Sequence, residues 1–491
     1  MEARHGDLTR AWPGPGTRRD SQGDLRIMLV AGALALLAGA LAGLPVALAL
    51  GVLTAICLFA LVAARPVAGS YLLLSATPLL VGVDRGQLVP LLRPSEVLAL
   101  VVAAAVVARL LFELASGASL RPRFAPLDGV VLALVLAGSV LPLAWMFARG
   151  REIAQEDLLY ALWLWKYFAG YVIVRVTVRE ERHVRACLWI ALTASALVGT
   201  IGILEALGLL GLPELLARYY TPDGPGTAAQ ARASSTTGSP FALSDLMLFS
   251  LAIAAAWYLR VGTRRLLMAA LSVVFVFGLI ASGSASGLVG LAAGVVGLGL
   301  ITRRLGRVAL VAAPLTALAG VALKPVIDAK LANLDPVTGL PHSWVGRLDN
   351  LQTFFWPEIA RDGNWLTGVR LAARVRAPET WRDWVYIESG YTWLVWTGGV
   401  VLLVAFLVFV LVGLRTVARV ARERDDAVGV AAIASFACLC MLTVLMLLDA
   451  HLILRAAADL NFALLALALV GYRPGSRHPG GRGLVRRVSR A

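Results

Sequence analysis

The sequence predicts an all-α fold: a polytopic bundle of about 12–14 transmembrane helices with a large, partly helical extracytoplasmic loop. Hydrophobic residues make up 59% of the 491 residues, and the mean hydropathy is +0.78. Only 15% of the residues are charged, whereas soluble domains average about 25%. The apolar residues also gather into runs of about 20, the length that crosses a bilayer as a helix. A soluble globular protein is therefore excluded.

Fourteen apolar segments are candidate spans. The second follows the first almost at once and the third is short, so treating these two as re-entrant leaves twelve full crossings. The candidate spans are 27–44, 46–64, 67–83, 95–116, 128–148, 158–178, 184–212, 241–260, 265–282, 285–302, 308–323, 389–414, 428–449 and 451–471.

The distribution of arginine predicts the orientation of the bundle. Counted over alternate connections, 29 Lys and Arg fall on one side and 16 on the other, and eight of those 16 lie in one long loop. Short loops rich in Lys and Arg face the cytoplasm, and long loops are discounted. Both termini are therefore expected in the cytoplasm. The formal charge of +15 is accounted for by this orientation, and no nucleic-acid partner is predicted.

These assignments divide the chain into five parts. They are a cytoplasmic N-terminal tail (1–26), an N-terminal bundle of about 11 spans (27–323), the large extracytoplasmic loop (324–388), the C-terminal spans (389–471) and a basic cytoplasmic tail (472–491). Lysine is rare among the 45 cations, which indicates the codon bias of a GC-rich bacterial genome. We expect a multi-pass protein of the bacterial cytoplasmic membrane. The four cysteines match no disulfide or metal-binding spacing.

The loop 324–388 contains a helical pattern. Over 344–362, apolar and aromatic residues recur at helical spacing with polar residues between them. This pattern predicts an amphipathic helix on the outer membrane face, and a plain structural loop helix is the alternative.

Ionisable residues within the spans lie in the predicted outer half of the bundle. Lys166 lies roughly 12 Å deep and Glu205 at a similar depth, so these two are expected to pair. The other members are Asp245, Asp449, His451, Arg455 and Asp459, of which Arg455 and Asp459 form a possible i,i+4 pair. Buried groups of this kind face the bundle interior or an aqueous cavity. We expect a cavity that opens outward, with structural ion pairs as the alternative.

Six segments, in this order, resemble the O-antigen ligase and polymerase superfamily, which consists of bacterial membrane glycosyltransferases of the GT-C type. The resemblance covers about 66–470. The segments are RPSEVLALV, FAPLDGVVLALVLAGS, RASSTTGSPFALSDLMLFSLAIA, IASGSASGLVGLAAG, GRLDNLQTFFWPEIARDGNWLTGV and YIESGYTWLVWTGGVVLLVAFL.

The resemblance implies the reaction and two site residues. A sugar hydroxyl attacks the anomeric carbon of an undecaprenyl-diphosphate-linked glycan, and the diphosphate leaves. Arg232 occupies the place of an arginine that contacts the lipid diphosphate in the family. The family's arginine after the ninth span is replaced by the Ser284-Ala285-Ser286 turn. Glu388 stands where the ligases have a histidine, and an acidic residue there is more similar to the polymerase branch.

This chemistry needs cations for the diphosphate and a base for the hydroxyl proton. Arginine suits the first need because its fork binds phosphate oxygens in bidentate fashion. Glu388 is the expected base, at a membrane boundary where desolvation makes a carboxylate more basic. Glu388 and Arg232 are the predicted catalytic residues, and the predicted substrate-binding residues are Arg347, Arg370, Lys166, Tyr391 and His342, the last also an alternative base.

A structural role is the alternative for each of the main residues. Glu388 would only cap its helix, Arg347 would be a surface arginine of the loop helix, and Arg232 would lie in a mobile Gly/Ser/Thr-rich loop. The glycines Gly283, Gly287, Gly290 and Gly294 are expected to allow close helix packing. No cofactor or metal is predicted, because no Asp-x-Asp motif lies in an outer loop.

The sequence thus predicts a metal-independent glycosyltransferase that polymerises lipid-linked glycan on the outer face of the membrane. Its predicted partners are the undecaprenyl-diphosphate-linked glycan, membrane lipids, and a chain-length regulator or other polysaccharide-assembly proteins. Three alternatives remain: a ligase that transfers glycan to a lipid or cell-wall acceptor, a carrier or flippase for a lipid-linked solute, and an inactive scaffold. A carrier would place broken helices near the midplane in repeated halves, and the sequence has no convincing repeat.

Overall fold

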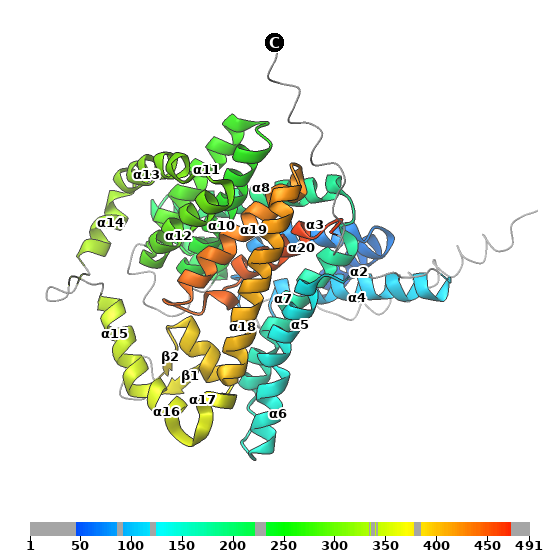
Figure 1. The fold of residues 1–491 in the computed structure, drawn as a ribbon, viewed down its shortest axis with the longest axis vertical. Coiled ribbons are helices and arrows are strands. Elements are labelled where there is room, and N and C mark those ends of the chain that lie inside the picture. The colour runs from blue at the N-terminus through cyan, green and yellow to red at the C-terminus, as the bar shows by residue number, and fades with distance from the viewer. Residues whose placement is uncertain are drawn as a thin grey trace, which may run out of the picture. The chain divides into compact units, whose positions relative to one another are not determined.

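A computed structural model describes residues 46–85, 92–117, 124–220, 232–332, 334, 339, 342–377 and 384–472. The predicted tail 1–26, the first span 27–44 and the basic tail from residue 473 lie outside the described residues. The chain divides into a unit that ends at Leu58 and a second unit that begins at Phe59. The arrangement given below concerns the second unit (Figure 1).

The described part of the chain is almost entirely helical. The longer helices are α2 (Val46–Ala64), α3 (Val67–Leu80), α4 (Pro94–Ala115), α5 (Pro126–Ala137), α6 (Val140–Ala148), α7 (Gln155–Thr177), α8 (Glu181–Ala206), α9 (Leu212–Tyr219), α10 (Pro240–Arg260), α11 (Arg265–Ala281), α12 (Ala285–Thr302), α13 (Leu305–Ala322), α14 (Lys324–Leu331), α15 (His342–Asn350), α18 (Gly390–Glu423), α19 (Ala427–Leu445) and α20 (Ala457–Ala468). The shorter elements are η2 (Ser235–Thr237), η3 (Leu351–Phe355), α16 (Trp356–Ala360), η4 (Arg361–Gly363), α17 (Asn364–Thr367), β1 (Arg374–Arg376), β2 (Trp384–Tyr386) and η5 (His451–Ile453).

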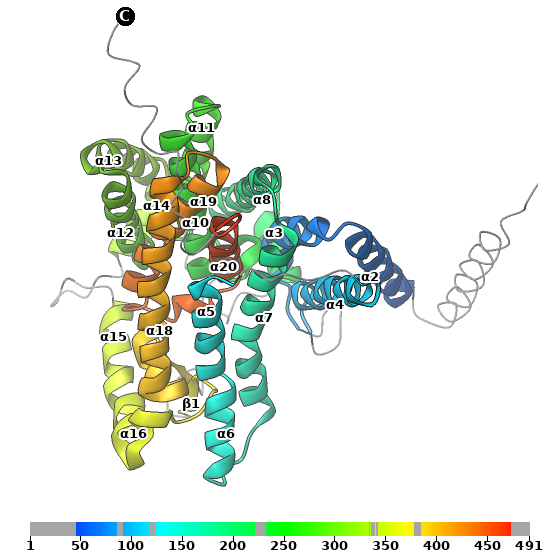
Figure 2. The same cartoon turned by 45° about the vertical axis from the view of Figure 1, so that its right-hand side comes forward.

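Eight helical segments in the described ranges are long and apolar enough to cross a membrane, and four shorter helices are also apolar. An all-α membrane protein is therefore confirmed at this level. Strand structure among the described residues is confined to one antiparallel pair, β1 with β2. Figure 2 shows α18, α7 and the α5–α6 segment side by side.

Three predicted spans differ from the helices observed. The segment 128–148 is broken at Gly138 and Ser139 into α5 and α6, and 184–212 ends as a helix at Ala206. The segment 451–471 contains the short η5 and the 12-residue helix α20. Helix α20 is about 18 Å long and too short to cross the hydrocarbon core alone. Every residue of α20 except Asp459 is buried. Its apolar character therefore reflects burial within the protein.

Small residues allow α12 to pack closely against α10 and α19. A Cβ atom added to Gly290 would lie 2.6 Å from Leu248 Cδ1, and one added to Gly294 would lie 2.9 Å from Met441 Sδ. Side chains at these positions would have to displace Leu248 and Met441 from the space between the helices. The predicted packing role of these two glycines is confirmed.

The helix predicted within the outer loop is observed as the run from α15 to α16, which ends where Arg361 takes an extended conformation. Its residues Leu351 and Phe355 are buried, whereas Leu348 and Trp356 are exposed. The Phe355 ring meets Trp396 of α18 edge to face, with ring centroids 5.2 Å apart. One side of this helical segment therefore packs on the protein.

The outer loop packs against a break in α18. Gly398 and Gly399 leave the helical conformation, with φ of −135° and 64°. The carbonyl of Trp396 accepts a hydrogen bond from Val369 N at 2.7 Å. This hydrogen bond replaces one that the helix cannot form at its break. The loop backbone therefore supplies the donor that the Trp396 carbonyl needs.

Gly399→Ala should lower the melting temperature of the detergent-solubilised protein. The new Cβ would lie 2.2 Å from Leu366 O at a residue with positive φ, and this combination costs more than about 1 kcal/mol. Gly320→Ala is the matched control, because its Cβ meets no atom within 4 Å and alanine favours helix. Equal melting temperatures for the two variants would contradict the prediction.

Candidate functional site

The loop that carries Arg232 is fixed by its neighbours. Glu205, at the end of α8, accepts hydrogen bonds from Ser234 N at 3.1 Å and Ser235 N at 2.6 Å. Thr236 Oγ1 donates to Pro78 O at 2.8 Å, and the residues of η2 are buried. These hydrogen bonds fix the described part of the loop in place, which differs from the mobile-loop alternative. The expected pairing of Glu205 with Lys166 is wrong, because the carboxylate holds these backbone N–H groups.

Glu205→Ala should displace the loop and lower both stability and activity. Two buried backbone donors would lose their acceptor, at about 1–3 kcal/mol each. Glu205→Gln keeps one acceptor oxygen and should retain part of the stability. The melting temperatures of both variants would be compared with that of wild type; values equal to wild type would show that the carboxylate does not position the loop.

Arg232 is a partly buried cation beside a second cation. Its Nε donates to Ser282 O at 3.3 Å, and its guanidinium lies 5.1 Å from the centre of the Phe241 ring. Burial, and then the charge of Arg347, lower the pKa of Arg232 to about 10. Among the described residues no carboxylate pairs with it. The contacts leave its charge uncompensated and available to an anion.

Arg347 joins the loop helix α15 to the bundle. Its side chain is 10% exposed, its Nε lies 3.5 Å from Glu388 Oε2, and its Nη2 lies 3.7 Å from Asp449 Oδ2. Nη1 donates to Leu448 O at 2.8 Å, and the guanidinium lies 5.4 Å from the ring of Phe241. The surface-arginine alternative is wrong. Three residues singled out in the sequence, Arg232, Arg347 and Glu388, lie in one cluster.

A buried histidine and aspartate adjoin this cluster. His451 Nδ1 lies 2.7 Å from Asp245 Oδ2, and both side chains are fully buried. Burial alone would lower the pKa of His451, but the charge and hydrogen bond of Asp245, with Asp449, outweigh it and raise the pKa above its usual value. His451 Nε2 has no hydrogen-bond partner in the described ranges. The sequence placed both residues in the outer half without predicting that they pair.

The turn between α11 and α12 also lies beside Arg232. Ala233 N donates to Ala281 O at 3.0 Å, and Ser282 offers its carbonyl to Arg232. Ser284 and Ser286 join their hydroxyls at 2.7 Å. This turn therefore brings neutral hydroxyls beside the site.

Three other predicted binding residues lie elsewhere or are not described. Arg370 pairs with the fully buried Asp157 at 2.9 Å, which fixes the loop to the start of α7. Tyr391 donates its hydroxyl to Thr443 O at 2.9 Å, within the contact of α18 and α19. His342 begins α15, and its side chain lies outside the described part.

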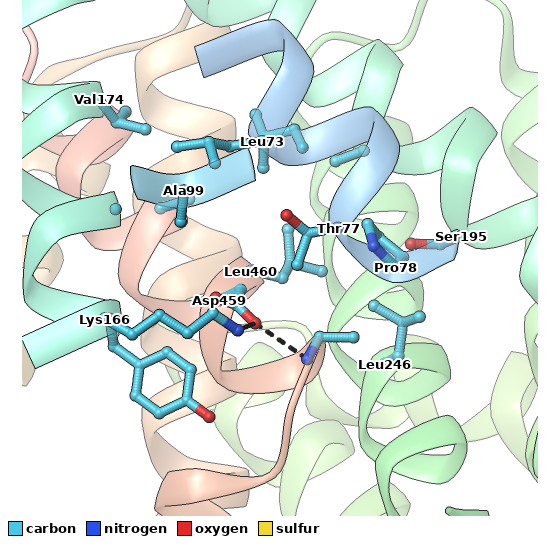
Figure 3. A pocket seen from close by; sticks show the side chains of 16 residues that line it. Leu73, Thr77, Pro78, Ala99, Lys166, Val174, Ser195, Leu246, Asp459 and Leu460 are labelled. Atoms are coloured by element: carbon cyan, nitrogen blue, oxygen red, sulfur yellow. Dashed lines mark hydrogen bonds and ion pairs between the residues drawn. The ribbon is translucent and has the colours of Figure 1, made fainter. Parts of the chain in front are cut away.

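Lys166 forms an ion pair with Asp459, with Nζ and Oδ2 3.0 Å apart. Figure 3 shows the two side chains meeting at the edge of a pocket. The expected pairing of Arg455 with Asp459 is wrong, because Arg455 precedes α20 and Asp459 is held by Lys166 and by Ala456 N.

No protein-family model, curated protein or solved structure matches this chain. Within the described ranges, no three His, Cys, Asp or Glu side chains are grouped so that they could hold a metal ion. The arrangement offers an uncompensated guanidinium at Arg232 and carboxylates at Glu388 and Asp449. Together these groups can bind an anion and accept a proton.

Proposed function

We propose that this protein is a membrane glycosyltransferase that polymerises lipid-diphosphate-linked oligosaccharides on the outer face of the bacterial cytoplasmic membrane. The observation that carries the proposal is Arg232: partly buried, without a carboxylate partner among the described residues, and beside Arg347. An uncompensated cation in such a place is explained by an anionic substrate. A diphosphate on a lipid carrier is the anion that the motif resemblance implies.

The orientation is supported by the arginines at the end of the bundle opposite the Arg232 cluster. Helices α10 and α18 end there, and α11, α13 and α19 begin there. The cations at this end are Arg260, Arg264, Arg265, Arg303, Arg304, Arg307, Arg415, Arg419, Arg422 and Arg424. The positive-inside rule assigns that end to the cytoplasm, so the Arg232 cluster faces outward.

The proposed reaction forms one bond and breaks another at the same carbon. The hydroxyl oxygen of the acceptor sugar bonds to the anomeric carbon of the donor, and the bond from that carbon to the diphosphate oxygen breaks. Arg232 stabilises the negative charge that the leaving diphosphate gains. Glu388 accepts the hydroxyl proton, and Arg347 Nε lies 3.5 Å from its Oε2.

Glu388→Gln tests this function in proteoliposomes that contain an undecaprenyl-diphosphate oligosaccharide pool. Wild type should produce a ladder of glycan lengths, and the variant should lose about 10²–10⁴-fold in rate, because glutamine cannot accept the proton. Glu358→Gln, a substitution of a partly exposed acid in α16 that pairs with Arg361, is the matched control and should retain the ladder.

The same experiment separates the alternatives. A single transfer to another acceptor without a ladder would indicate a ligase. Unchanged glycan length, with lipid-linked glycan moved between leaflets, would indicate a carrier and overturn the proposal.

A further inference from the structure

One aromatic ring near the start of α10 is shared by two cations. The guanidinium carbon of Arg232 lies 5.1 Å from the centre of the Phe241 ring, and that of Arg347 lies 5.4 Å from the same centre. Phe241 itself is partly buried. The face of an aromatic ring is negative and attracts a cation, most strongly where water is excluded. Phe241 thus contacts both arginines of the cluster at once.

The two cations reach this ring from different parts of the chain. Arg232 precedes η2, and Arg347 belongs to α15 in the outer loop. Arg232 Nε donates to Ser282 O at 3.3 Å after α11, and Arg347 Nη1 donates to Leu448 O at 2.8 Å after α19. Like charges repel each other, and the charge of Arg347 helps to lower the pKa of Arg232. The shared ring attracts both cations and so offsets part of this repulsion.

The stem of Arg232 lies against a glycine. A Cβ atom added to Gly283 would lie 3.1 Å from Arg232 Cγ, and Gly283 has a positive φ of 57°. Glycine adopts such a conformation without strain, and its missing side chain makes room for the arginine. The stem therefore follows the turn between α11 and α12, while the guanidinium lies over Phe241.

The first turns of α10 hold the ring in a fixed place. Asp245 lies four residues after Phe241 and so on the same face of the helix. Its Oδ2 lies 2.7 Å from His451 Nδ1, and both of these side chains are fully buried. Ser244 packs so closely on Gly287 of α12 that an added Cβ atom would clash there. Phe241 is therefore presented from a rigid backbone, as a preorganised site requires.

We propose that Phe241 is a positioning residue of the anion site: it holds Arg232 and Arg347 together as a pair, and this pair selects a lipid diphosphate over a lipid monophosphate. The inference rests on the proposed function, which supplies the ligand. A diphosphate carries oxygens on two phosphorus atoms, and each set can take one guanidinium fork. A monophosphate offers one set and gains less from the second fork. Phe241 acts through the two arginines and takes no part in the bond changes.

Ring fluorination separates this role from packing. Fluorine withdraws electron density from the ring face, which weakens the attraction for a cation, while the shape of the side chain hardly changes. Phe241 would be replaced in the full-length protein by mono-, di- and trifluorophenylalanine. The affinities of the detergent-solubilised protein for geranylgeranyl diphosphate and geranylgeranyl monophosphate would then be measured. The diphosphate affinity should fall at each step, by about tenfold for the trifluoro variant, and the monophosphate affinity should fall less.

Ordinary substitutions provide the controls. Phe241→Leu should lose about as much diphosphate affinity as the trifluoro variant, because leucine has no ring. Phe241→Tyr keeps the ring and should bind as wild type does. Phe436→Leu removes a partly buried phenylalanine of α19, and as the matched control it should leave both affinities unchanged.

The outcomes distinguish this proposal from the proposed function, since the measurement needs no glycan transfer. Equal diphosphate affinity in wild type, the trifluoro variant and Phe241→Leu would overturn the role of Phe241, and equal losses for diphosphate and monophosphate would overturn the selection. Arg232→Gln should bind the diphosphate more weakly. If it does so while the Phe241 series is unchanged, only the role of the ring is refuted. If Arg232→Gln binds as wild type does, the anion site is refuted, and the proposed function with it.

Discussion

Arg232→Ala should reduce glycan transfer by about 10²–10³-fold, the effect of removing one group that stabilises charge developing in a transition state. The bond that breaks leaves negative charge on the diphosphate, and Arg232 is the cation of the cluster without a carboxylate partner in the described ranges. Alanine leaves Arg347 alone to offset this charge, although Arg347 is already close to Glu388 and Asp449. The measurement is the initial rate of ladder formation in proteoliposomes.

Two further variants make the Arg232 result specific. Arg232→Lys keeps the charge but loses the bidentate fork, so its activity should fall between those of wild type and Arg232→Ala. Arg218→Ala removes an exposed arginine that stacks on Tyr219 in α9 and should leave transfer unchanged. Membrane abundance should be equal in all three. Equal transfer by Arg232→Ala and Arg218→Ala would exclude Arg232 from the chemistry.

Asp245→Ala should destabilise the protein by about 3–5 kcal/mol, because removing one partner of a buried ion pair leaves the other uncompensated. His451 and Asp245 are both fully buried, and their atoms Nδ1 and Oδ2 are 2.7 Å apart. The substitution should lower the melting temperature more than Asp425→Ala, which removes an acid that is 88% exposed. A drop no larger than that of Asp425→Ala would show that the pair does not stabilise the fold.

The same pair predicts a dependence of stability on pH. The folded protein holds the His451 pKa above 6.5, so His451 binds its proton more tightly when folded than when unfolded. This stabilisation is fully present below about pH 6.5 and is lost as the pH rises through the folded pKa. The melting temperature should therefore fall as the pH rises above 6.5. His451→Gln should flatten this dependence, and an unchanged pH profile would exclude His451 as its source.

Much of the fold could be predicted because hydropathy reports burial in lipid or protein over a whole helix. The predicted span 241–260 corresponds closely to Pro240–Arg260, and 285–302 to Ala285–Thr302. The segment 451–471 was harder, because a helix buried by other helices is as apolar as one in contact with lipid. Helix α20 begins only at Ala457, after η5 and a turn at Ala456, whose φ is 63°. Hydropathy marks neither η5 nor this turn.

The candidate site could be predicted in part. Arg232, Arg347 and Glu388 were singled out from their motifs, and they lie together. The pairing of Asp245 with His451 joins residues 206 positions apart, and one sequence has no local pattern that links them. Lys166 and Glu205 have similar predicted depths, but depth says nothing about which face of a helix a side chain occupies. In the structure Lys166 of α7 pairs with Asp459 of α20, whereas Glu205 belongs to α8.

The break in α18 determines how parts of this protein could be exchanged with those of another. Val369 N bonds the carbonyl of Trp396, and Leu366 O occupies the space where a side chain at Gly399 would lie. A chimera that replaces the outer loop but keeps α18 would leave that carbonyl unpaired and that space empty. A working graft of the outer loop therefore needs its downstream junction beyond Gly399, and it must keep the pair of Arg370 with Asp157 of α7.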